Sequence, residues 1–154
     1  MEIRTYNLEL NEYKHPVMVE DTSRVYSGGN LNSESAAVEM LEECFSLSRQ
    51  AEEKVYMIAL DTKNNPIGVF EVSHGSVNTS CCSPREIFIR ALLCGAVRII
   101  IAHNHPSGDT TPSKDDLEAM EKIRRAGEHI NIRLIDFLIV AGGKHKSCIS
   151  YSHI

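Results

Sequence analysis

The sequence lacks an apolar run long enough to cross a membrane. Its most apolar stretch lies around Val97 to Ala102, far short of the roughly 20 residues that a spanning helix needs. The first residues, M-E-I-R-T-Y, also lack the basic and then apolar pattern of a secretion signal. We therefore expect a cytoplasmic protein without a membrane partner.

Cysteine motifs are missing as well, because the five cysteines form no C-x-x-C pair. An odd number of cysteines without a secretion signal favours reduced thiols over a disulfide framework. Adjacent Cys81 and Cys82 would point to opposite sides of an extended chain, so we do not expect them to share a metal ion. The cysteines are expected to act as small buried hydrophobic residues.

The sequence has no excess of basic residues. Lys and Arg number 16 against 21 Asp and Glu, which gives a net charge of −5. Non-specific affinity for nucleic acid comes from cationic side chains that displace counterions from phosphates, so the net charge does not support DNA as a partner. A local basic patch stays compatible with DNA binding.

Length and composition predict one compact domain over residues 1–154. A hydrophobic content of 42% and a charged content of 24% are ordinary for globular proteins, and 154 residues suit a single core. Residues 1–30 are the least informative part. They indicate only a strand region, from Val17, Val19 and Val25 at even spacings, and a turn at Gly28 to Asn30.

Helical and strand patterns alternate through the rest of the chain. We expect helices from Ser33 to about Gln50, from Ser83 to Gly95 and from Ser113 to about Gly127, and strands at Lys54 to Leu60, Ile67 to Ser73, Val97 to Ala102 and Asn131 to Ala141. Such alternation predicts an α/β fold in which a mixed sheet is flanked by helices on both sides. Sites in open sheets of this kind lie at the ends of central strands.

Two histidines lie where one such strand ends. His103 and His105 are two residues apart, so in an extended chain both imidazoles project to the same side. Asp116 lies in the first turn of the helix that Ser113 begins, and two imidazoles with one carboxylate suit a zinc ion that keeps a fourth position for water. Alone, a His-x-His pair is weak support for a metal, and Ser113-x-x-Asp116 is an ordinary capping box. Together they predict a metal site.

One pattern in this stretch resembles the JAMM metalloprotease signature of the JAB/MPN domain family. It consists of His103-x-His105-Pro106, then six intervening residues, then Ser113-x-x-Asp116. The string H-N-H-P-S-G-D-T-T-P-S-K-D-D resembles the bacterial RadC branch of that family. Similar landmarks lie at Leu60 to Asn64, Ser83 to Glu86, Ala91 to Leu93 and Leu134 to Asp136. The resemblance covers roughly residues 30–150 and implies a cytidine-deaminase-like three-layer sandwich.

By that resemblance, His103, His105 and Asp116 would hold Zn²⁺, and Glu71 would be the general base. Ser113 would stabilise the oxyanion. The implied activity is hydrolysis of a peptide or isopeptide bond in a protein or peptide substrate. From its residue type alone, Glu71 reads as a solvent-facing strand carboxylate, so its role depends on the resemblance.

Two departures from the family pattern bear on function. RadC-like chains commonly carry histidine after the aspartate of the last strand, whereas this chain has Asp136-Phe137. Residues 1–30 are too short and too strand-like for the helix-hairpin-helix region of longer RadC proteins, which leads us to expect a stand-alone catalytic domain.

Two alternatives stay open: a DNA repair or recombination protein, acting as a nuclease or accessory factor, and a non-catalytic interaction module. The intact ligands argue against the second, and the sequence does not indicate an oligomeric state.

Overall fold

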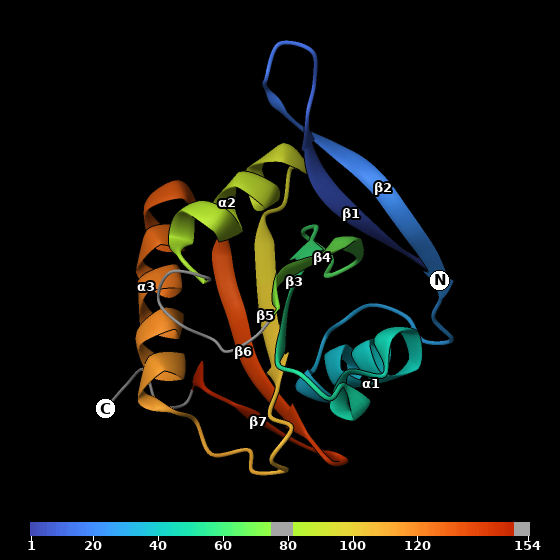
Figure 1. Ribbon diagram of the computed structural model, residues 1–154, viewed down its shortest axis with the longest axis vertical. Coiled ribbons are helices and arrows are strands. Elements are labelled where there is room, and N and C mark those ends of the chain that lie inside the picture. Colours follow the sequence, from blue (N-terminus) through green and yellow to red (C-terminus); the bar gives the residue numbers. More distant parts are fainter. Residues whose placement is uncertain (75–81, 150–154) are drawn as a thin grey trace.

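The computed structural model describes residues 1–74 and 82–149, and in these residues seven strands form one mixed sheet with helices on both faces (Figure 1). The elements are β1 (Glu2–Leu10), β2 (Pro16–Val25), α1 (Glu34–Phe45), the 3-10 helix η1 (Leu47–Arg49), β3 (Lys54–Leu60), β4 (Pro66–His74), α2 (Pro84–Leu93), β5 (Arg98–Asn104), α3 (Lys114–Ile130), β6 (Arg133–Ala141) and β7 (Lys144–Ser147). The strand order is β2-β1-β4-β3-β5-β6-β7. The predicted fold class is confirmed.

Alternate residues of the central strands enter two separate cores. Val55 and Ile101 belong to the core under α2 and α3, whereas Tyr56 and Ala102 belong to the core under α1. Figure 1 shows α2 and α3 on one face of the sheet and α1 on the other. Because both faces are covered, β5 is apolar on both sides, as expected for a fully buried strand.

Helix boundaries differ in detail from the prediction. The first helix ends at Phe45 rather than near Gln50, since Ser46 adopts a left-handed conformation with φ 50° and η1 follows. The second helix begins after Ser83 as predicted, with Pro84 in its first turn, but the Ser83 side chain makes no capping hydrogen bond. Proline pre-sets the helical backbone at that position, which accounts for the start of the helix without a side-chain cap.

Strands β1 and β7 were not predicted individually. β1 and β2 form an antiparallel hairpin, which confirms a strand region within residues 1–30, and β1 joins the main sheet through Thr5 beside Val69 of β4. β7 reads K-H-K-S and carries no apolar signal, so its strand conformation comes from pairing with β6.

Cys44, Cys94 and Cys148 are free thiols, as predicted. Cys44, Cys82 and Cys148 are buried and Cys94 is half-buried, whereas Cys81 lies outside the described residues. No helix in residues 1–74 or 82–149 combines the length and the apolar character needed to span a membrane.

Candidate metal centre

The end of β5 and the start of α3 bring the predicted ligands together. The His105 N–H donates to the Val140 carbonyl of β6, which continues the sheet one residue beyond β5. The chain then turns, since the Gly108 N–H donates back to the His105 carbonyl. Gly108 has φ +89°, a conformation that residues with a side chain rarely adopt. This turn returns the chain to the sheet so that α3 starts beside the histidines.

His103, His105 and Asp116 offer three ligand atoms that face one another. The His103 Nε2 atom lies 3.1 Å from His105 Nε2 and 3.0 Å from an Asp116 oxygen, and His105 Nε2 lies 3.3 Å from the other Asp116 oxygen. Ligands about 2.0–2.1 Å from a tetrahedral zinc ion stand about 3.3 Å apart. The three side chains therefore fit a zinc ion, and they are the one such group among the described residues.

The cluster is buried on one side and open on the other. His103 and Asp116 are 0% and 2% exposed, whereas the side chain of His105 is 13% exposed. An isolated carboxylate is costly to bury unless it is paired or binds a metal. Burial alone would raise the pKa of Asp116, but the contacts with His103 and the hydrogen bonds with Ser113 outweigh it and lower this pKa to about 2. Asp116 is thus ionised, as a metal ligand must be.

The ring of His105 is oriented by a backbone carbonyl. Its Nδ1 lies 2.7 Å from the Asp109 carbonyl oxygen, which can only accept, so Nδ1 carries the hydrogen. In the neutral ring, Nε2 then presents a lone pair toward the other two ligands, the tautomer that binds metals. The role of Asp109 could not be predicted from the sequence, since a backbone carbonyl leaves no residue-type signal.

Among the described residues, His103 has no comparable partner. Its buried Nδ1 makes no hydrogen bond with residues 1–74 or 82–149, and besides His105 the Phe137 ring lies beside it, edge-on, with centroids 5.6 Å apart. Phe137 occupies the position where RadC-like chains commonly carry histidine. The side of the His103 ring next to Phe137 therefore faces an apolar group in this protein.

Ser113 and Asp116 form the predicted capping box. The Ser113 N–H donates to an Asp116 carboxylate oxygen at 2.8 Å, and the Asp116 N–H donates to the Ser113 hydroxyl oxygen at 3.0 Å. These two bonds fix Asp116 at the start of α3. The Ser113 hydroxyl thus accepts in this box, and its side chain also hydrogen-bonds the Asp116 carboxylate. Asp115, the neighbour, is exposed and faces solvent.

Asn104 also contributes, although the sequence did not single it out. Its side chain accepts the Lys54 N–H at 2.7 Å and donates to the carbonyls of Gln50 and Glu52 at 3.3 and 3.0 Å. Asn104 is only 1% exposed. It therefore ties the end of β5 to the segment before β3 and steadies the strand between the two histidines.

Glu71 lies in β4 and is not joined to the three ligands by any described contact. Its register partner is Tyr56, a residue of the core under α1, whereas His103 pairs with Val55, a residue of the core under α2 and α3. The Glu71 carboxylate lies 3.4 Å from Lys54 Nζ and 3.9 Å from His74 Nδ1. Its role as the general base stays a prediction.

The sequence is similar to a known domain family. The family described as "RadC-like JAB domain" matches residues 31–153. A "UPF0758 protein" of Clostridium tetani is 43% identical over 116 residues, which are 75% of this chain and 50% of that protein. Another from Moorella thermoacetica is 39% identical over 116 residues, 75% of this chain and 49% of that protein. The chain thus spans about half the length of these curated relatives.

Proposed function

The chain belongs to the RadC-like JAB domain family, and on that premise we propose that it is a zinc-dependent hydrolase of the JAMM type that cleaves a peptide or isopeptide bond. The observation that carries the proposal is the triangle of His103, His105 and Asp116, whose facing atoms lie 3.0 to 3.3 Å apart. Two imidazoles and one carboxylate leave zinc one position for water, which is the arrangement of catalytic rather than structural zinc sites.

A zinc ion held there would supply a hydroxide nucleophile near neutral pH and polarise the carbonyl of the substrate. The protein's own groups would do the rest. His105, kept in one tautomer by the Asp109 carbonyl, and Asp116, fixed by the capping box, hold the ion in place. Ser113 lies at the exposed start of α3, and its O–H would donate to the oxygen on which negative charge develops. Removing such a donor commonly costs about 3 kcal/mol of transition-state stabilisation.

Glu71 is proposed as the base that takes the proton of the attacking water and passes it to the leaving nitrogen. This assignment rests on the family resemblance. In the structure its carboxylate is 42% exposed, lies beside Lys54 and projects from the face of the sheet opposite His103, so the proposed role requires a local rearrangement of β4.

The test uses zinc-loaded protein and a panel of peptides that includes lysine-linked isopeptides. We expect Glu71→Gln to bind zinc normally and to lose at least about a hundredfold in hydrolysis, the range in which general bases contribute. Glu52→Gln is the matched control, since Glu52 is an exposed glutamate that contacts His74 and has no proposed role. A Glu71→Gln variant as active as the parent would refute the mechanism, and a parent inactive on the whole panel would count against the peptidase assignment.

The alternative of a DNA repair or recombination role stays a prediction that the family name suggests. A mobility shift that weakens steeply with salt would support it. Since the chain spans about half of its relatives, the activity of the longer proteins is a separate question.

A further inference from the structure

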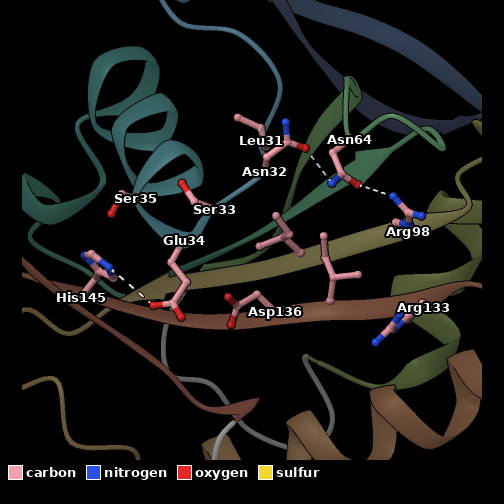
Figure 2. Close-up of a pocket in the computed structure, with 12 residues that line it drawn as sticks. Leu31, Asn32, Ser33, Glu34, Ser35, Asn64, Arg98, Arg133, Asp136 and His145 are labelled. Atoms are coloured by element: carbon pink, nitrogen blue, oxygen red, sulfur yellow. Dashed lines mark hydrogen bonds and ion pairs between the residues drawn. The ribbon is translucent and has the colours of Figure 1, made fainter.

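A cavity lies on the opposite face of the sheet from His103, His105 and Asp116. It has a volume of about 690 Å³ and opens between the start of α1 and the strands β5, β6 and β7. Figure 2 shows Arg98 and Arg133 at one end and Glu34, Asp136 and His145 toward the other. The volume falls within the range of about 300–1,000 Å³ that is usual for small-molecule sites. Nothing in the proposed hydrolysis uses this cavity.

The positive end consists of two arginines side by side. Arg98 and Arg133 are direct partners in the parallel pairing of β5 and β6, and both line the cavity. Arg98 donates to the Asn64 side-chain oxygen at 2.7 Å and to the Thr62 carbonyl at 3.0 Å. Within residues 1–74 and 82–149, neither guanidinium has a carboxylate within 4.0 Å. Like charges directly opposite each other are unfavourable, so an anion seated between them would stabilise both.

At the negative end of the cavity, the carboxylates of Asp136 and Glu34 repel each other. Asp136 pairs with Ile100 in register and faces the cavity. Burial raises the pKa of Asp136, and the nearby Glu34 carboxylate raises it further, against hydrogen bonds from Ser147 and the Phe137 N–H. Glu34 lies 3.7 Å from His145 Nε2. A cation seated beside Asp136 and Glu34 would offset the repulsion between them.

We propose that this cavity binds a small aminocarboxylate, with its carboxylate on Arg98 and Arg133 and its ammonium group on Asp136 and Glu34. A ligand of one sign would satisfy one end and be repelled by the other, whereas a zwitterion satisfies both. Ile100 and Ile135 line the cavity along with the charged groups and offer apolar contact to a short hydrocarbon spacer. The site is distinct from the metal centre because its residues lie on the face that α1 covers.

The experiment is calorimetric titration of the full chain, first treated with a chelator and then dialysed, since aminocarboxylates also bind zinc. The probes are aminocarboxylates with spacers of increasing length, from glycine through 4-aminobutyrate to 6-aminohexanoate. Butylamine and butyrate are the controls that carry a single charge. We expect one spacer length to bind best and each control to bind at least about tenfold more weakly, because each control lacks the charge-assisted contacts at one end of the cavity.

Two variants locate the site. Arg133→Gln changes an exposed side chain, and Asp136→Asn keeps an oxygen that accepts from Ser147 and the Phe137 N–H. Each should weaken the best probe about tenfold or more, whereas Arg85→Gln, an exposed arginine of α2 on the opposite face, should leave binding unchanged. If none of the aminocarboxylates from glycine to 6-aminohexanoate binds, the proposal is overturned. Butylamine or butyrate binding as tightly as the best probe, or unchanged binding in both cavity variants, would overturn it too.

Discussion

Asp116 joins metal binding and helix capping in one side chain, so we predict that Asp116→Asn separates the two. One carboxylate oxygen accepts the Ser113 N–H at 2.8 Å, and the other lies 3.0 Å from His103 Nε2. The amide oxygen of asparagine can keep the first contact, while its NH₂ group replaces the oxygen that faces His103. A neutral NH₂ group does not bind a cation, so α3 stays capped and the metal affinity falls.

The magnitude follows from binding linkage. Zinc at 100 times its dissociation constant stabilises the parent by about 2.7 kcal/mol, because it binds the folded state only. For a chain of this size that corresponds to a rise of about 5–10 °C in Tm. Loss of a residue that only supports a metal ligand weakens metal binding by up to about a hundredfold. If Asp116→Asn weakens zinc binding by that factor, the stabilisation at the same zinc concentration falls to about 0.4 kcal/mol. The Tm shift then falls below about 2 °C.

The assay is thermal unfolding of metal-stripped protein at increasing zinc concentrations. Asp115→Asn is the matched control, since Asp115 is the exposed neighbour in the same first turn of α3. The parent and Asp115→Asn should show the full zinc-dependent rise, and Asp116→Asn should show almost none. A full rise in Asp116→Asn, or an equal loss in Asp115→Asn, would refute the ligand assignment.

Three further predictions concern Ser113, Phe137 and Gly127. Ser113→Ala should lower the Tm by about 2–4 °C through loss of the helix cap and slow hydrolysis about a hundredfold. Ser113→Thr should retain both the stability and the hydrolysis rate. A Ser113→Ala variant that loses stability but keeps full activity would contradict the oxyanion role. Phe137→His should give His103 Nδ1 a partner and tighten zinc binding about tenfold in a chelator competition, and unchanged or weaker binding would count against it. Gly127→Ala would place a Cβ 2.2 Å from the Ile132 carbonyl oxygen. Alanine favours helices by about 1 kcal/mol, but this clash should still lower the free energy of unfolding in urea by about 1–3 kcal/mol. A stabilised variant would contradict the close packing.

The ligand stretch could be predicted from sequence because its determinants are short-range. The same-side projection of His103 and His105 follows from two-residue spacing in a strand, and the capping box follows from the three-residue spacing of Ser113 and Asp116. The bounds of β3 were also predicted residue for residue, since an apolar run there gives way to a polar turn.

What could not be predicted depends on register and on backbone groups. The pairing of β3 with β4 is irregular after Glu71, where the partner of Val55 is Ser73. Because a shift of one residue exchanges the two faces of a strand, the sequence cannot show on which side Glu71 projects. The pairing of Arg98 with Arg133 likewise arises only when β5 and β6 align, 35 residues apart in the chain.

The central claim is that His103, His105 and Asp116 hold a zinc ion. Metal analysis by mass spectrometry, on protein purified without chelator and incubated with zinc, tests it most directly when the parent is measured beside His103→Ala. We predict about one zinc per chain in the parent and almost none in the variant. A metal-free parent, or a variant that retains the same zinc content, would contradict the claim.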